Sequence, residues 1–296
     1  MADKKNQNLM QLIKKVHGFV ENTDLDKHRQ SQDQFGNIFS NNWDVEYKDV
    51  DISGMHGEWV SVERTHMKKY VILYCHGGGF STGSCIYGRT LTSKLAKSTS
   101  MDVLSFDYRL APENPYPAAV EDVVKAWDYL MLLGYGARDV IVAGDSAGGN
   151  LALTLVHQLK KQGRILPRGL VLLSPWTDLT SSGESFGEKA EVDPVLNKEY
   201  INRMIEAYAT DNKLNNLLIS PLFGDFKGFP PTCIQVGENE ILLSDSVRLH
   251  QKMIEANVSV HMDIFEGMWH VFQMSPFKTA YEAMDNCAEF IFDICR

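Results

Sequence analysis

The sequence predicts an α/β fold in which helices cover both faces of a mostly parallel sheet. From about residue 69 onward, apolar segments of strand length alternate with amphipathic helical segments. Several strand segments, such as 69–75 and 139–143, are almost continuously apolar, which is typical of parallel strands buried on both faces. A Gly-x-Ser-x-Gly pentapeptide at 144–148 joins one of these strands to a helix. Together these observations predict one large α/β domain.

The segment before the first strand predicts an accessory cap. Residues 8–20 place their apolar side chains on one helical face, which predicts an amphipathic helix. The following stretch, 24–42, is polar, with Phe35, Ile38 and Phe39 as its apolar residues. We interpret residues 1–42 as an N-terminal cap segment and 43–296 as the catalytic domain. A dispensable N-terminal tail is the alternative.

The remaining elements follow from the period of the apolar residues. The segments 43–50 and 57–63 alternate apolar and polar residues, as half-buried antiparallel strands do. Strands are predicted at 69–75, 102–106, 139–143, 169–174, 231–236 and 258–264, and helices at 89–98, 117–133, 149–159, 244–256 and 278–294. A polar stretch, 177–193, interrupts this alternation, and a helical segment follows it at 194–208. We interpret about 177–215, called the insertion below, as a second cap segment.

Composition narrows the class of protein. The 296 residues are long enough for a large core, and 44% hydrophobic and 23% charged residues are ordinary for a globular protein. A net charge of -9 without a run of Lys or Arg argues against nucleic acid or an anionic membrane as partner. A polar start and the lack of a transmembrane-length apolar run predict a cytoplasmic protein without stable membrane association. Five scattered cysteines predict reduced thiols and no zinc site.

The pentapeptide offers a candidate nucleophile. A strand that turns this tightly into a helix forces Ser146 into a strained backbone conformation and lifts its Oγ out of the sheet. Gly144 and Gly148 suit the crossing of strand and helix because a Cβ there would crowd it. A serine in an ordinary glycine-rich turn is the alternative.

A glycine loop offers candidate oxyanion donors. His76-Gly77-Gly78-Gly79 follows the strand at 69–75. We predict that the N–H groups of Gly77, Gly78 and Ala147 stabilise a negative oxygen, at roughly 3 kcal/mol per donor. A phosphate-binding loop is an alternative, but the Gly-Lys-Ser/Thr of that motif is absent. A merely flexible turn is the other.

A base is expected downstream of the serine. Among the histidines beyond Ser146, His157 and His250 fall within helices and His261 lies in the middle of a strand. His270 lies in the loop after that strand, where the imidazole can reach Oγ. We therefore predict His270 as the base.

The acid has more than one candidate. Glu238, Glu240 and Asp245 all follow the strand at 231–236. Asp245 lies at a predicted helix start, where an acidic residue has a structural role with the helix dipole. Glu240 lies in the loop itself and can orient the imidazole. We predict Glu240, and Asp245 remains the alternative.

Four motifs resemble those of the hormone-sensitive-lipase-like esterases of the α/β-hydrolase superfamily. They are HGGGF at 76–80, DYRLAPE at 107–113, GDSAGGN at 144–150 and GMWH at 267–270, and the similarity runs from about residue 59 to the C-terminus. The resemblance implies an α/β-hydrolase fold, with a helical cap built from the N-terminal segment and an insertion after Ser174. It also implies hydrolysis of short acyl esters without metal or organic cofactor, and a homodimer through the strand at 258–264. The segment 107–113 would brace the oxyanion loop.

One motif departs from the family pattern. The family usually has Gly-x-x-Asp-Pro-Leu where this chain reads GENEIL at 237–242. The position of the acid is therefore occupied by Glu240.

The sequence thus predicts a serine carboxylesterase that acts on small esters through an acyl-enzyme intermediate. An amidase or deacetylase with the same triad, and a hydrolase-like receptor without catalysis, are the alternatives; a peptidase and a long-chain lipase are disfavoured. The predicted lining of an apolar substrate pocket is Phe80, Trp176, Tyr200, Met204 and Tyr208, for which ordinary core packing is the alternative.

Overall fold

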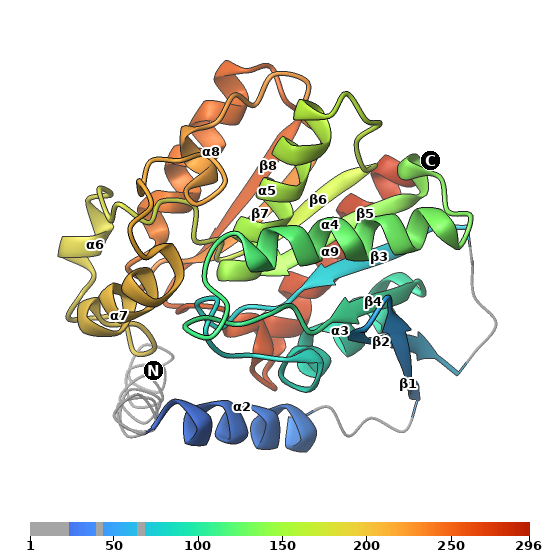
Figure 1. Ribbon diagram of the computed structural model, residues 1–296, viewed down its shortest axis with the longest axis horizontal. Helices are drawn as coiled ribbons and strands as arrows, with labels where there is room; N and C mark the ends of the chain where they lie inside the picture. The colour runs from blue at the N-terminus through green and yellow to red at the C-terminus, as the bar shows by residue number, and fades with distance from the viewer. Residues whose placement is uncertain (1–23, 40–43, 64–68) are drawn as a thin grey trace.

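The fold is organised around one eight-stranded sheet in the part of the chain that the structure describes. That structure is a computed structural model describing residues 24–39, 44–63 and 69–296. The strand order is β1-β2-β4-β3-β5-β6-β7-β8 (Figure 1). The strands are β1 (Val45–Ile52), β2 (Met55–Val62), β3 (Val71–Cys75), β4 (Asp102–Phe106), β5 (Val140–Asp145), β6 (Gly169–Leu173), β7 (Thr232–Gly237) and β8 (Val260–Phe265). The predicted α/β fold is confirmed.

The directions of the strands follow the patterns of their residues. β1 pairs with β2, and β2 with β4, in antiparallel fashion, whereas the pairs from β4 through β3 to β8 are parallel. Every residue of β3, β5, β6 and β7 is buried, as their continuous apolar character predicts. The alternating strands β1 and β2 lie at one edge of the sheet.

Helices cover both faces of the sheet. The described α-helices are α2 (Leu25–Phe39), α3 (Cys85–Thr99), α4 (Ala118–Leu132), α5 (Ala147–Lys161), α6 (Ser185–Glu188), α7 (Lys198–Ala209), α8 (Leu243–Glu255) and α9 (Lys278–Cys295). Leu73 packs in one core cluster with residues of α4, α5 and α8, while its neighbour Ile72 packs in another with residues of α3 and α9 (Figure 1). Successive strand residues thus point to opposite cores.

The N-terminal segment contributes one described helix. Within the stretch at 24–42, read from the sequence only as polar, Leu25–Phe39 form α2, which packs against α3 (Figure 1). Arg29 anchors it: its guanidinium donates to the carbonyls of Ser81 at 2.9 Å and Ala111 at 3.1 Å. The same side chain pairs with both carboxylate oxygens of Glu113, at 2.9 and 2.8 Å. The helix predicted at 8–20 lies outside the described residues.

Two helix starts differ from prediction because of caps. α3 begins at Cys85 rather than at residue 89, since Ser84 accepts the N–H of Tyr87 and caps the helix. α7 begins at Lys198 rather than at residue 194, since Asn197 accepts the N–H of Tyr200. α6 and α7 both lie in the insertion. The division into cap and catalytic domain stays a prediction.

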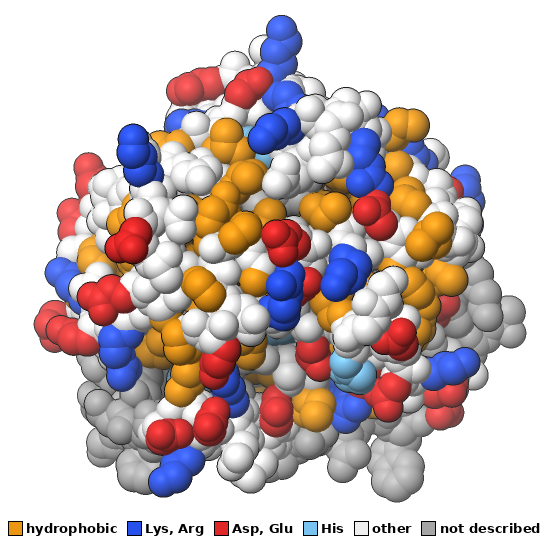
Figure 2. Space-filling model, viewed as in Figure 1, with side chains coloured by type: hydrophobic (Ala, Val, Ile, Leu, Met, Phe, Trp, Pro, Cys, Tyr) orange, Lys and Arg blue, Asp and Glu red, His pale blue; other side chains and the backbone are white. Residues whose placement is uncertain are grey.

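The surface carries charges of both signs. On the face shown in Figure 2, Lys and Arg side chains are interspersed with Asp and Glu. Among the helices of residues 24–39 and 69–296, none combines the length and apolar character needed to cross a bilayer. All five cysteines carry free thiols, and four of them are buried.

Candidate active site

The candidate residues gather at the carboxyl edge of the parallel strands. The glycine loop follows β3, Ser146 follows β5, Glu240 follows β7 and His270 follows β8. Because neighbouring parallel strands end at the same edge, their following loops meet there. Residues far apart in the sequence therefore form one site.

The turn between β5 and α5 places Ser146 in a strained conformation. Its φ of 52° and ψ of -118° are sterically unfavourable for a residue with a side chain. The neighbouring glycines leave the space that this turn needs. A Cβ on Gly148 would overlap the carbonyl oxygen of Cys75, and one on Gly144 would overlap that of Gly148. The local sequence thus fixes the position of the serine.

Replacing Gly148 with alanine is expected to destabilise the protein by about 3 kcal/mol, because the new methyl group meets backbone on β3 that cannot retreat. Urea unfolding followed by circular dichroism measures the change. Gly187→Ala is the matched control, since a Cβ there meets no described atom within 4 Å. Equal stability of the two variants would contradict the packing argument.

Ser146, His270 and Glu240, called the triad below, form a continuous chain of contacts. His270 Nε2 lies 3.0 Å from Ser146 Oγ, and His270 Nδ1 lies 2.7 Å from Glu240 Oε2. A carboxylate only accepts hydrogen bonds, so this contact places a proton on Nδ1. Nε2 is then free to accept the serine proton.

The structure brings Glu240, and not Asp245, to the histidine. Glu240 Oε1 accepts hydrogen bonds from Ser174 Oγ at 2.9 Å and from the Gly237 N–H at 2.5 Å. Asp245 instead accepts the N–H groups of Thr177 and Asp178, at 2.7 and 2.8 Å. Burial raises the pKa of Asp245 to about 7. Asp245 therefore holds the backbone at the start of the insertion.

Electrostatics favour a protonated His270. Burial alone would lower its pKa, but the hydrogen bond and the charge of Glu240 outweigh that effect. The charges of Asp193 and Asp145 act in the same direction. The pKa of His270 is therefore raised above its ordinary value of 6.5. This environment stabilises a positively charged imidazole at His270.

The predicted set of oxyanion donors in the glycine loop requires a correction. The N–H of Gly77 donates to Asp145 Oδ1 at 2.8 Å, so it is not available to an oxyanion, and the prediction for Gly77 is wrong. Gly78 and Gly79 have φ values of 106° and 61°, which favour glycine. Their N–H groups, and that of Ala147, donate no hydrogen bond to another described residue. Gly79, which the sequence analysis did not select, joins Gly78 and Ala147 as a group with a free donor.

Asp145 holds the glycine loop in place. Its buried carboxylate accepts hydrogen bonds from Tyr74 Oη, from Tyr87 Oη at 3.1 Å and from the Gly77 N–H. Burial raises the pKa of Asp145, and these donors offset part of that rise. The residue before Ser146 therefore fixes the first peptide of the glycine loop.

The predicted pocket residues lie beside the glycine loop. Phe80 stacks on Tyr208 with ring centroids 3.8 Å apart and contacts Trp176 at 5.9 Å. A Cβ on Gly79 would come 2.8 Å from Met204 Cγ, which places Met204 against the loop. Tyr200 also lies on α7, with its ring 5.9 Å from that of His28. All five side chains are buried, and their role in binding substrate stays a prediction.

Several polar residues that complete the site escaped sequence reasoning. Ser174 Oγ accepts the N–H of Val271 at 3.1 Å while it donates to Glu240, and so connects the acid to the histidine loop. Asp193, in the insertion, lies close enough to His270 to affect its pKa. The only sequence signal for Ser174 was its place at the end of a buried apolar strand.

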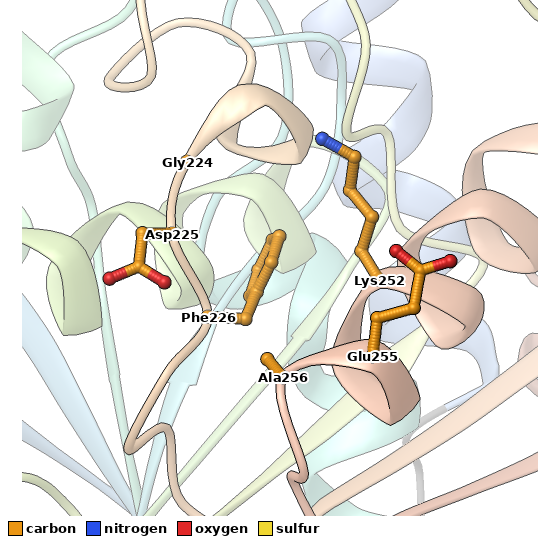
Figure 3. Close-up of a pocket in the computed structure, with 6 residues that line it drawn as sticks. All are labelled: Gly224, Asp225, Phe226, Lys252, Glu255 and Ala256. Carbon is orange, nitrogen blue, oxygen red and sulfur yellow. The ribbon is translucent and has the colours of Figure 1, made fainter.

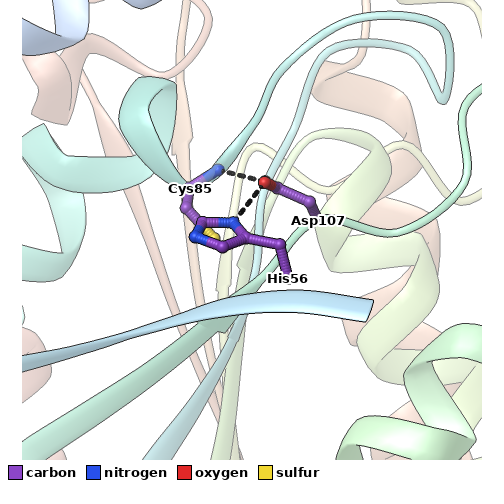
Figure 4. Close-up of side chains that lie close together, drawn as sticks. All are labelled: His56, Cys85 and Asp107. Carbon is purple, nitrogen blue, oxygen red and sulfur yellow. Dashed lines mark hydrogen bonds and ion pairs between the residues drawn. The ribbon is translucent and has the colours of Figure 1, made fainter. Parts of the chain in front are cut away.

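One group of side chains resembles a metal site in composition. His56, Cys85 and Asp107 have ligand atoms within 4.8 Å of one another (Figure 4). However, His56 Nδ1 lies 2.6 Å from Asp107 Oδ2, closer than the roughly 3.3 Å that separates two ligands of a tetrahedral zinc ion. Asp107 Oδ1 also accepts the Cys85 N–H at 2.6 Å. These contacts are those of a hydrogen-bonded unit that joins β2, β4 and α3.

A separate hollow lies on the surface between the end of η2 (Pro221–Phe223) and α8. Its lining is Gly224, Asp225, Phe226, Lys252, Glu255 and Ala256 (Figure 3). No member of the triad takes part in this lining. We do not assign it to the reaction.

Comparison with known proteins identifies the family of the chain. Residues 72–274 match a family model described as an alpha/beta hydrolase fold. The chain is 39% identical over 261 residues to an esterase of Acinetobacter venetianus, covering 87% of this chain and 86% of that protein. It is 36% identical over 242 residues to an acetyl-hydrolase of Streptomyces hygroscopicus, covering 82% and 79%. A crystal structure of a hormone-sensitive lipase from a metagenome library matches with a TM-score of 0.92 at 35% identity, covering 100% of this chain and 99% of that one.

Proposed function

The chain belongs to the α/β-hydrolase family, among the esterases related to hormone-sensitive lipase, and is a carboxylic ester hydrolase; from this premise we propose that it hydrolyses esters of short acyl chains through an acyl-serine intermediate. The observation that carries the proposal is the continuous contact from Ser146 through His270 to Glu240. That arrangement suits a serine nucleophile with a histidine base.

In the proposed acylation step, Ser146 Oγ attacks the ester carbonyl carbon. His270 Nε2 takes the serine proton, and the charge of Glu240 stabilises the resulting imidazolium. The N–H groups of Gly78, Gly79 and Ala147 donate to the carbonyl oxygen as it becomes negative. Their lack of other partners among the described residues supports this role.

The tetrahedral intermediate then collapses and breaks the bond to the leaving alkoxide, which takes the proton from His270. Water enters, and His270 removes a proton from it as the water oxygen attacks the acyl carbon. The second tetrahedral intermediate collapses and breaks the bond between the acyl carbon and Ser146 Oγ, which releases the carboxylic acid, while His270 returns its proton to Ser146 Oγ. None of these reaction steps needs a metal or an organic cofactor.

The preference for short acyl chains rests on two kinds of support. A relative that covers most of this chain is an acetyl-hydrolase. Phe80, which follows the glycine loop, stacks on Tyr208, and Met204 lies against Gly79. With Trp176 and Tyr200, these apolar side chains suit a small acyl or alcohol group.

Fluorophosphonate labelling and a chain-length series test the proposal. A fluorophosphonate is expected to label Ser146, identified by peptide mass spectrometry, and to abolish hydrolysis in proportion. Among p-nitrophenyl esters, kcat/KM is expected to peak at acetate to butyrate. A protein that does not label would contradict the nucleophile, and a peak at palmitate would contradict the chain length.

The rate is expected to fall in mild acid. The base must be neutral to accept the serine proton, and the environment raises the pKa of His270 above 6.5. Activity should therefore be present above that raised pKa and be lost as the pH falls through it. A profile of kcat/KM for p-nitrophenyl acetate between pH 5 and 9 measures this acidic limb, the pH range over which the rate falls. Fluorescence monitors unfolding in the same range. A limb well below pH 6.5 would contradict the described environment.

A further inference from the structure

The insertion forms hydrogen bonds to both backbone polar groups of Ile241, the residue that follows Glu240. Asp193 Oδ2 accepts the N–H of Ile241 at 2.8 Å. Ser185 Oγ donates to the carbonyl of the same Ile241 at 2.7 Å. Ile241 directly follows Glu240 in the chain. Two residues of the insertion therefore hold both polar groups of one residue in the acid loop.

The side chains of Asp193 and Ser185 are themselves held by further hydrogen bonds. Asp193 is 2% exposed, and its other oxygen accepts the N–H groups of Val195 and Leu196, at 2.8 and 2.9 Å. Ser185 Oγ also accepts the N–H of Ser244 at 2.8 Å, and its own N–H donates to Ser244 Oγ at 2.9 Å. Buried groups with all these bonds satisfied have little freedom to move.

A glutamate needs such support more than an aspartate would. Its side chain has one more rotatable bond, so the carboxylate position depends more strongly on a fixed backbone and fixed partners. Ser174 and the Gly237 N–H hold one oxygen of Glu240. The backbone next to Glu240 is held by the insertion through Ile241.

We propose that Asp193 is a positioning residue for ester hydrolysis: together with Ser185 it ties the insertion to the loop that carries Glu240. The inference rests on the proposed function of the triad. The insertion then sets the alignment of the acid and histidine in addition to any contact with substrate.

Charges from three elements act on His270. Glu240 comes from the loop after β7, Asp145 from the end of β5 and Asp193 from the insertion, and each favours the imidazolium. Burial raises the pKa of Asp193 to about 6, and the charge of His270 opposes that rise. At pH 8 Asp193 is therefore ionised. Removing its charge is expected to lower the pKa of His270.

Asp193→Asn tests the inference in the full-length protein, because it keeps the shape of the side chain and removes the charge. With p-nitrophenyl acetate at pH 8, kcat is expected to fall about 10- to 100-fold, while KM changes by less than about 2-fold. The acidic limb of kcat/KM is expected to move to lower pH by about half a unit or more. Asp211→Asn, which removes an exposed carboxylate from the same insertion, is the matched control and should behave as the unmodified protein.

Two results would overturn the inference. One is an unchanged rate and limb in Asp193→Asn; the other is a lower rate with an unmoved limb, which indicates a structural role alone. If Asp193→Asn does not fold, Ser185→Ala decides: a fall in kcat of about 5-fold or more supports the grip on Ile241, and an unchanged kcat contradicts it. Failure of the proposed function is distinguishable, because the unmodified protein would then escape labelling by fluorophosphonate.

Discussion

Ser146→Ala is expected to lower kcat for p-nitrophenyl acetate by about 10⁴-fold or more. Alanine cannot form the acyl intermediate, and His270 Nε2, 3.0 Å from Oγ, loses the group that it deprotonates. The remaining rate would come from the free N–H donors and from water activated by His270. Because the methyl group fits the same space, the fold should be unchanged.

Stopped-flow and steady-state assays with the purified variant measure this loss. Ser246→Ala is the control, since the Ser246 hydroxyl is buried in α8 and has no hydrogen-bond partner among the described residues. It should retain nearly full activity. A Ser146→Ala protein with more than about one hundredth of the original rate, free of contaminating esterase, would contradict the proposed nucleophile.

Glu240→Gln should have the second largest effect, a fall in kcat of about 10³- to 10⁴-fold. The amide keeps the size of the side chain but removes the charge that stabilises the imidazolium. Its NH₂ group can donate to Nδ1, which favours the tautomer with the proton on Nε2, and that tautomer cannot accept the serine proton. The acidic limb of the pH profile should also move to lower pH, because Glu240 is the main group that raises the pKa of His270.

Asp245→Asn separates the two acids that the sequence left open. Asp245 bonds to the backbone of Thr177 and Asp178, so its amide variant should lose stability before it loses chemistry. We expect kcat within about 5-fold of the unmodified protein at 25 °C, together with a lower melting temperature. A large loss of kcat in the folded Asp245→Asn protein, with Glu240→Gln still active, would reverse the assignment.

The sequence predicts most of this fold because its signals are local and strong. β3 is continuously apolar and is separated from β4 by the helix α3, and β5 is buried throughout and is separated from β6 by the helix α5. The pattern does not depend on knowing which strands are neighbours. Helix ends are less predictable, since the starts of α3 and α7 are decided by the side chains of Ser84 and Asn197.

In the candidate site, too, some residues can be predicted from the local sequence and others cannot. Ser146 and His270 stand at positions that their local sequence marks, in a strand-to-helix turn and in a loop after a strand. The local sequence does not distinguish Gly77 from Gly79, because both are glycines of one loop. Only the contact of Gly77 with Asp145, 68 residues away, decides which N–H groups remain free. Asp193 is equally hidden: in sequence it is one acid in a polar stretch, and its partner Ile241 is 48 residues away.

Arg29 attaches α2 to the rest of the protein through a more exposed contact than those that attach the insertion. Its pair with Glu113 lies at the surface, with side chains 22% and 54% exposed, whereas the contacts of Asp193 and Ser185 with Ile241 are buried. Dissolved ions screen exposed charges over about 8–10 Å and affect buried hydrogen bonds far less. Ionic strength should therefore loosen α2 over Ser81 and Ala111 while the acid loop stays aligned. In saline solution, the attachment of α2 and the alignment of the triad would then vary independently.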